Sequence, residues 1–170
     1  MSARKPSAPT KITSPLSGMP SASWLLLDSQ MCFALYSASL TMTKIYKPLL
    51  ARFALTYPQY LVLLVLWEHD QCSVSELGER LYLDSGTLTP LLKRLEALEY
   101  VSRERDGEDE RRVIVSLTPT GRSLRQKVLT VPQSVSCATQ CSLPELKTLT
   151  GQLVKLRKSL SGNLAPGTVP

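Results

Sequence analysis

Four cysteines are the side chains of this sequence best suited to redox chemistry. Cysteine reacts as the thiolate, which attacks hydroperoxides and disulfides. In an intracellular protein, scattered cysteines are more typical of redox-active or inert thiols than of a structural disulfide framework. The chain has one histidine and no Cys-x-x-Cys, so we expect no zinc site, no other metal ion and no cofactor. The cysteines are Cys32, Cys72, Cys137 and Cys141.

Two clusters of polar and basic side chains are typical of nucleic-acid binding. A helix that enters the major groove needs short polar side chains at its start and long basic ones nearby. The first cluster has this pattern and consists of Ser85, Thr87, Thr89, Lys93 and Arg94. Arginines at a hairpin tip can enter the narrow minor groove. The second cluster consists of Arg103, Arg105, Arg111 and Arg112. Interleaved acids, including Glu104 and Glu108, leave a solvated charged surface as the alternative.

The elements that position both clusters are predicted by caps and periodicity. A capping box at Ser73 opens a short helix that ends near Leu81, and Asp84 caps a longer helix with leucines at helical spacing. Two such helices joined by a tight turn indicate a helix-turn-helix. Alternating residues at 100–105 and 112–117, around a charged turn at 106–111, predict a β-hairpin directly after it. This order is the plan of a winged helix.

Further helices are predicted on both sides of this lobe. One begins near Asp28 and is expected to break or kink before Pro48; a second begins at Tyr57-Pro58 and runs to about 68. Others begin near Pro119 and at a capping box on Ser142. We therefore expect a flexible tail (1–23), an N-terminal sensing and dimerisation region (24–58), a DNA-binding lobe (59–118), C-terminal dimerisation helices (119–162) and a frayed end (163–170).

Composition limits the class of protein. A chain of 170 residues is the size of one domain with a helical arm. The net charge of +6 comes from the two ends, because residues 24–130 contain as many acids as bases. Any argument for DNA binding must therefore come from the local arrangement of charged and polar residues and not from the net charge. The longest apolar run, 61–67, is too short to span a bilayer, so we expect a cytoplasmic bacterial protein without membrane contact.

The wing region carries a more specific signature. Residues 109–118 read Asp-Glu-Arg-Arg-Val-Ile-Val-Ser-Leu-Thr and continue into Pro-Thr-Gly. This segment resembles the D-x-R-x-x-x-V-x-L-T signature of the multiple antibiotic resistance regulator (MarR) family. The segments 30–36, 56–60 and 81–95 are similar to the organic hydroperoxide resistance regulators (OhrR) of that family, of the two-cysteine type. The resemblance covers roughly residues 25–160.

The resemblance implies a fold and a mode of DNA binding. The fold is mainly α with a small β-wing: a winged helix-turn-helix that forms a homodimer through its N- and C-terminal helices. Two lobes would grip successive major grooves of a pseudo-palindromic, double-stranded operator. The residues at the start of the recognition helix, which contact the DNA, would be Ser85, Thr87 and Thr89. Arg111 would enter the minor groove, oriented by an ion pair with Asp109.

The resemblance also assigns the thiols. Cys32, expected about one turn into the first helix, matches the peroxide-sensing cysteine, and the positive end of the helix dipole favours its thiolate. Tyr36, Tyr46 and Tyr57 match the tyrosines that hydrogen-bond this thiolate. From the residues alone, an inert cysteine in an apolar helix is the alternative. Cys137 matches the resolving cysteine, which pairs with the sensing cysteine of the other chain.

The sequence also gives expectations for two further thiols and for the one histidine. Cys141 is a substitute for Cys137 if one helix carries both thiols on the same side. Cys72 matches no functional position and is expected to be inert, and His69 is expected at the surface. The functional expectation is a transcriptional repressor, not an enzyme, that organic hydroperoxides release from DNA. The alternatives are a ligand-responsive repressor of the same family and a thiol peroxidase.

Overall fold

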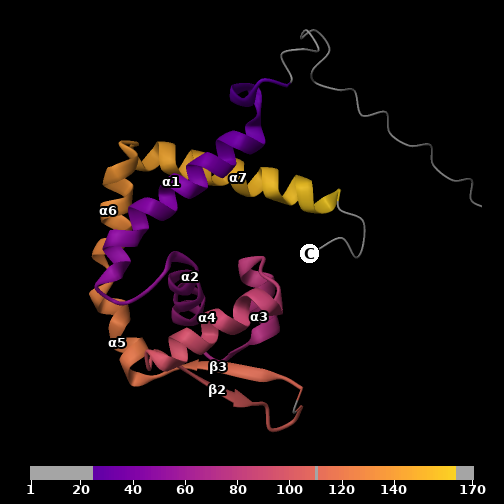
Figure 1. Cartoon of the computed structure of the whole chain (residues 1–170), viewed down its shortest axis with the longest axis vertical. Helices are drawn as coiled ribbons and strands as arrows, with labels where there is room; N and C mark the ends of the chain where they lie inside the picture. The colour runs from indigo at the N-terminus through magenta and orange to yellow at the C-terminus, as the bar shows by residue number, and fades with distance from the viewer. Residues whose placement is uncertain (1–24, 110, 164–170) are drawn as a thin grey trace, which may run out of the picture. The chain divides into compact units, whose positions relative to one another are not determined.

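The computed structural model describes residues 25–109 and 111–163 (Figure 1). The predicted N-terminal tail (1–23) lies outside the described residues, as does the predicted frayed end except for Asn163. The chain divides into two compact units, one up to Thr41 and one from Met42 onward. The described part of the first unit holds a 3-10 helix, Leu27–Ser29, and the beginning of helix α1, Met31–Ala51. The second unit holds the rest of the elements.

Helix α1 continues past Pro48, so the predicted break is wrong. A proline inside a helix lacks the N–H that would bond to the carbonyl four residues earlier. Only three residues follow Pro48 in α1, and Leu50 among them is completely buried. The burial of this leucine holds the last turn in place at the cost of one hydrogen bond. The helix then ends, and Ala54 turns the chain with a φ of 54°.

Helix α2, Tyr57–Glu68, forms the centre of the core, as its all-round apolar sequence predicts. Its start is fixed by the side chain of Gln59, whose Oε1 accepts hydrogen bonds from the Thr56 N–H at 2.8 Å and the Thr56 hydroxyl at 3.0 Å. Buried apolar side chains each stabilise the fold by about 1.5–3 kcal/mol. The buried residues of α2 are Gln59, Tyr60, Val62, Leu63, Val65 and Leu66.

The helix-turn-helix forms as predicted from helices α3, Val74–Leu81, and α4, Ser85–Ala97. Ser73 and Glu76 make the capping box of α3, with the Glu76 carboxylate 2.7 Å from the Ser73 N–H. The turn packs tightly, because a Cβ on Gly78 would lie 2.7 Å from the Leu83 carbonyl oxygen. Helix α4 turns Leu88, Leu92 and Leu95 into the core.

The predicted hairpin is present as strands β2, Val101–Arg105, and β3, Val113–Leu117, paired antiparallel with Arg103 opposite Val115. A third strand, β1 at Cys72–Ser73, pairs with the other edge of β3, so the sheet order is β1-β3-β2. Two residues carry no periodicity, and the sequence did not reveal this strand. Within the described residues the architecture is a winged helix-turn-helix, mainly α with a small β-wing (Figure 1).

Three helices follow the wing: α5, Pro119–Lys127, α6, Thr130–Thr139, and α7, Leu143–Gly162. The Thr118 hydroxyl accepts the Gly121 N–H at 3.0 Å and caps α5, while Ser142 caps α7. The break between α5 and α6 was not anticipated. Helix α7 has no buried residue, and it carries exposed leucines at Leu143, Leu149, Leu153 and Leu160. None of the described helices combines the length and hydropathy that crossing a membrane requires.

Candidate DNA interface and thiol sites

Five residues of the two predicted DNA-binding clusters line one concave surface, whereas Thr87, Lys93, Arg94 and Arg105 lie outside its lining. A groove of about 370 Å³ lies between helix α3, the start of α4 and the wing hairpin, and we call it the reading groove. It combines hydroxyl groups from two helices with guanidinium groups from the wing, which suits the phosphates and base edges of a duplex. Its lining residues are Ser73, Val74, Ser75, Ser85, Thr89, Leu92, Arg103, Arg111, Arg112 and Val113. The sequence predicts Ser73 only as a helix cap, and neither Ser73 nor Ser75 as a residue that contacts DNA.

The start of α4 is held by Asp84. Its Oδ1 accepts the Thr87 N–H and its Oδ2 accepts the Thr87 hydroxyl, both at 2.8 Å. These hydrogen bonds lower the pKa of Asp84 below its ordinary value, so the cap stays charged. Thr87 is therefore part of the helix cap. The exposed Thr89 hydroxyl donates to the Ser85 carbonyl at 2.7 Å, which leaves its lone pairs available as acceptors.

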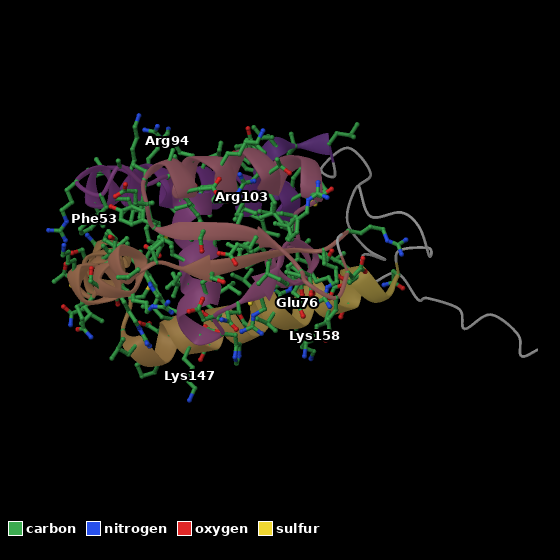
Figure 2. All side chains as sticks on the ribbon, turned by 90° about the horizontal axis from the view of Figure 1, so that it is seen from below. Phe53, Glu76, Arg94, Arg103, Lys147 and Lys158 are labelled. Carbon is green, nitrogen blue, oxygen red and sulfur yellow. The ribbon has the colours of Figure 1, made fainter. Side chains whose placement is uncertain are left out.

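The two basic residues predicted on α4 are both exposed. Lys93 and Arg94 follow Thr89 by about one turn, and the side chain of Arg94 is labelled in Figure 2. Among the described residues neither cation takes part in an ion pair. Both charges are therefore available to an acidic partner.

The predicted ion pair at the wing tip is present. Nε of Arg111 lies 3.5 Å from Oδ1 of Asp109, and the Arg111 N–H donates to the same oxygen at 3.0 Å. The Arg111 side chain is 95% exposed, so the acid orients the arginine without covering it. Arg112 is held in a similar way, with Nη1 3.5 Å from the Asp106 carboxylate. Contact of Arg111 with a minor groove stays a prediction.

Arg103 does not lie at the wing tip, and its prediction as a tip arginine is wrong. It belongs to strand β2, and its guanidinium forms an ion pair with Glu96 in the last turn of α4. Nε of Arg103 donates to Oε2 of Glu96 at 2.9 Å. The side chains are only 25% and 38% exposed. Arg103 lies two residues before the end of β2. The alternation of residues in the sequence predicts this strand but does not show that Arg103 meets Glu96 of α4. Arg105 ends β2 and is exposed.

Cys32 is the second residue of α1 and lies closer to the helix start than predicted. The first intrahelical hydrogen bond runs from the Ala34 N–H to the Gln30 carbonyl at 3.1 Å, so the earlier N–H groups point out of the helix end beside this thiol. Cys32 is exposed. Tyr36 follows one turn later on the same face of α1 and is 62% exposed.

Tyr46 and Tyr57 lie together in the second unit. Their ring centroids are 4.4 Å apart, and Tyr60 extends the stack at 6.0 Å from Tyr46. Burial, followed by the neighbouring phenols Tyr57 and Tyr60, raises the pKa of Tyr46 from 10.0 to about 12. Burial also raises the pKa of Tyr57. Both phenols therefore stay protonated at neutral pH and can donate hydrogen bonds to an anion. Their contact with Cys32 stays a prediction.

Cys137 and Cys141 are both exposed but do not share a helix. Cys137 lies in the last turn of α6, which ends at Thr139. Gln140 then takes a left-handed conformation, with a φ of 55°, and turns the chain before Cys141. The condition under which Cys141 could substitute for Cys137, one helix carrying both thiols, is therefore not met, because this turn ends the helix between them.

Cys72 and His69 lie together at the end of α2. The Cys72 thiol donates to the His69 carbonyl at 3.0 Å. Burial, together with the charges of Glu76 and Asp70, raises the pKa of Cys72, which favours the protonated thiol; that Cys72 is inert stays a prediction. His69 is exposed, as predicted. Within 25–109 and 111–163 no His, Cys, Asp or Glu residues form a cluster that could hold a metal ion.

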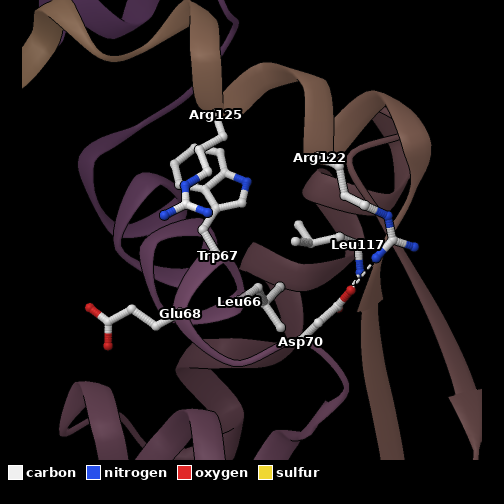
Figure 3. A pocket seen from close by; sticks show the side chains of 7 residues that line it. All are labelled: Leu66, Trp67, Glu68, Asp70, Leu117, Arg122 and Arg125. Carbon is white, nitrogen blue, oxygen red and sulfur yellow. Dashed lines mark hydrogen bonds and ion pairs between the residues drawn. The ribbon is translucent and has the colours of Figure 1, made fainter.

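A second cavity, of about 350 Å³, lies where α2, β3 and α5 meet (Figure 3). Trp67 is half-buried here and donates from Nε1 to the Gly121 carbonyl at 2.9 Å. Asp70 accepts the Leu117 N–H at 2.8 Å and pairs with Arg122. These polar groups satisfy one another, so the junction fixes α5 to the lobe.

Known proteins resemble this chain over most of its length. Residues 44–128 match the family described as transcriptional regulator SarA/Rot. The organic hydroperoxide resistance transcriptional regulator of Bacillus subtilis (strain 168) is 48% identical over 134 residues, which are 79% of this chain and 91% of that protein. The transcriptional regulator TtmR of Methylorubrum extorquens (strain PA1) is 50% identical over 144 residues, or 85% of this chain and 74% of that protein.

A solved structure agrees with these relatives. Reduced AbfR bound to DNA is 38% identical to the chain and superposes with a TM-score of 0.65 over 79% of this chain and 94% of that one. The wing signature, the capped recognition helix and these similarities lead to one assignment. The chain belongs to the MarR/SarA-type family of winged-helix transcriptional regulators and is a homologue of the organic hydroperoxide resistance regulators.

Proposed function

We propose that this regulator is a repressor that binds double-stranded operator DNA and is released by organic hydroperoxides. The observation that carries the DNA-binding part is the reading groove, which joins Ser85 and Thr89 of α4 to Arg111 of the wing. In winged-helix proteins, residues at the start of the recognition helix contact the major groove, and an arginine of the wing contacts the adjacent minor groove. The likeness to a DNA-bound regulator supports the same use of this surface.

The binding species is a homodimer. Helix α7 has no buried residue and exposes four leucines, and α1 exposes Met31, Tyr36 and Leu40. Apolar helix faces of this extent need a partner surface in water. A twofold dimer places two recognition helices about one DNA turn apart and so requires a pseudo-palindromic operator.

Cys32 is the sensing thiol. Its thiolate attacks the terminal oxygen of the hydroperoxide, the O–O bond breaks, and Cys32 becomes a sulfenic acid while the alkoxide leaves and takes a proton from water to become the alcohol. Cys32 is the second residue of α1 and is exposed, so a hydroperoxide can reach its sulfur. The protonated phenols of Tyr46 and Tyr57 supply hydrogen bonds to this anion across the dimer, from the other subunit, and Tyr36 lies one turn away on α1.

Cys137 resolves the sulfenic acid. The thiolate of Cys137 in one subunit attacks the Cys32 sulfur of the other, water leaves, and an inter-subunit disulfide forms. The exposed position of Cys137 at the end of α6 supports this role. Because the disulfide pulls on the helices that join the two lobes, it changes their spacing and releases the operator.

An operator-binding assay with and without cumene hydroperoxide tests this function. Wild type and Cys72→Ser, the matched control, should bind operator when reduced and lose it after treatment. Cys32→Ser should bind equally well and stay bound, because a hydroxyl cannot reduce the peroxide. Release of Cys32→Ser at the wild-type rate would refute the sensing role, and absence of operator binding by the reduced wild type would refute the repressor.

A further inference from the structure

The wing is joined to the recognition helix by a short connection and one ion pair. Only Leu98, Glu99 and Tyr100 separate α4 from β2, and Glu99 has a φ of 58°. The Tyr100 N–H donates to the Leu95 carbonyl at 3.0 Å, which closes this turn. Beyond it, the Arg103–Glu96 pair is the one ion pair between α4 and the wing among the described residues.

This pair is better placed than an ordinary surface ion pair. Nε and Nη2 of Arg103 both donate to Oε2 of Glu96, and neither side chain is more than 38% exposed. Arg103 also lines the reading groove beside Thr89 and Arg111. Figure 2 shows Arg103 on the strand that runs along α4. The side chain thus lies between the two elements that have to contact DNA together.

The angle between α4 and the hairpin determines where Arg111 lies. A strand of five residues is about 17 Å long. A tilt of about 10° at its base therefore moves the wing tip by about 3 Å, which is as long as a hydrogen bond. Arg111 and the start of α4 can contact DNA at the same time only if this tilt is restricted.

We propose that Arg103 and Glu96 form a brace that positions the wing against the recognition helix, so that Arg103 acts as a positioning residue for DNA binding. The proposal rests on the proposed function, because it concerns affinity for the operator. The Arg103 charge is already compensated by Glu96, unlike the exposed charge of Arg111. A phosphate would have to compete with this carboxylate for the same guanidinium.

The direction in which one substitution changes the affinity for operator DNA distinguishes a brace from a simple effect of charge. Glu96→Gln removes a negative charge from a DNA-binding lobe, which by electrostatics alone raises DNA affinity. The brace requires the opposite: weaker operator binding by about tenfold, the size of one lost protein–DNA contact. Glu104→Gln is the matched control, since Glu104 neighbours Arg103 on β2, is exposed and forms no ion pair with a described residue. It should leave affinity unchanged or raise it.

A charge exchange and a salt titration complete the experiment. Arg103→Glu should weaken operator binding, and the double variant Glu96→Arg, Arg103→Glu should recover most of the loss. Arg103→Ala should weaken binding without changing the salt dependence, whereas loss of a phosphate contact in each subunit would reduce the slope of log K against log salt by about 1.8. Thermal unfolding of each variant verifies that it is folded.

The outcomes are distinct. If reduced wild type binds operator and Glu96→Gln binds equally well or better, the brace is wrong while the proposed function stands. If Arg103→Ala lowers the salt slope, or the exchanged pair binds as weakly as Arg103→Glu, then Arg103 contacts DNA directly and the brace is again wrong. If reduced wild type binds no operator, both proposals fail.

Discussion

At the scale of single residues, hydrogen bonds and burial decide the state of each functional group. The carboxylate of Asp109 holds the backbone and guanidinium of Arg111 while the arginine stays exposed. Burial raises the pKa of Tyr46 and of Tyr57, which extends to alkaline pH the protonated state that phenols have at neutral pH. In the absence of a partner, the guanidinium of Arg111 is thus already oriented, and the two phenols can already donate hydrogen bonds to an anion.

Arg111→Ala should weaken operator binding by about 1–3 kcal/mol, because it removes an oriented cation from the wing tip. Titration of operator DNA at fixed salt measures the change. The rate at which peroxide oxidises Cys32 should stay at the wild-type value, since Arg111 lies in the wing. Unaltered DNA affinity would exclude the wing from the mechanism.

The raised pKa of Tyr46 gives stability a dependence on alkaline pH. Folding raises this pKa from 10.0 to about 12, so the folded state favours the protonated phenol. Its contribution to the free energy of unfolding is fully present below pH 10 and is lost as pH rises towards 12. Urea unfolding in steps across that window should show a steeper fall for wild type and Tyr36→Phe than for Tyr46→Phe. Equal slopes for all three proteins would contradict the burial of this phenol.

At the scale of elements, caps and close approaches determine how the helices meet the sheet. Gly121 in the first turn of α5 allows the helix to approach the carbonyl of Tyr100, where a Cβ would lie 2.0 Å from the oxygen. The Trp67 indole then bonds to the Gly121 carbonyl at 2.9 Å. These contacts fix the connection between the wing and the C-terminal helices.

Two glycine substitutions should therefore have opposite effects. Gly121→Ala should destabilise the protein by about 1–3 kcal/mol, because the new Cβ collides with backbone that cannot move aside easily. Gly151→Ala should stabilise it by about 0.5–1 kcal/mol, since a Cβ there meets open space in the middle of α7. Chemical denaturation measures both changes. A neutral Gly121→Ala would mean that α5 lies further from Tyr100.

At the scale of the whole molecule, the proposed switch depends on a second chain. Cys32 belongs to the first unit and Cys137 to the second, and each is exposed. A disulfide requires Cα atoms within about 7 Å of each other. In a twofold dimer each Cys32 can meet the Cys137 of the other chain, so two equivalent bonds are available.

Oxidised wild type should therefore run as a covalent dimer on a non-reducing gel, and Cys137→Ser should run as a monomer with Cys32 left as sulfenic or sulfinic acid. Mass spectrometry identifies the oxidised cysteine. Cys141→Ser is the control and should still crosslink, because the turn at Gln140 separates it from α6. Crosslinking by Cys137→Ser but not by Cys141→Ser would exchange the two roles.

Local sequence determined the elements of this protein. Ser73, Asp84 and Ser142 each cap the helix predicted for them, and the alternation at 101–105 and 113–117 produced the hairpin. Helix caps and hydrophobic periodicity act over a few residues, so the sequence of a short segment is enough to predict the helix or strand that it forms. The same local pattern carried the family signature of the wing.

Tertiary structure decided which distant groups meet. Strand β1 exists because β3 offers it an edge, and α1 continues past Pro48 because Leu50 is buried by residues far along the chain. Arg103 lies beside Glu96 and not at the predicted wing tip, because the turn at Glu99 brings β2 back along α4. Such pairings depend on the path of the backbone in three dimensions, which the spacing of residues in the sequence does not determine.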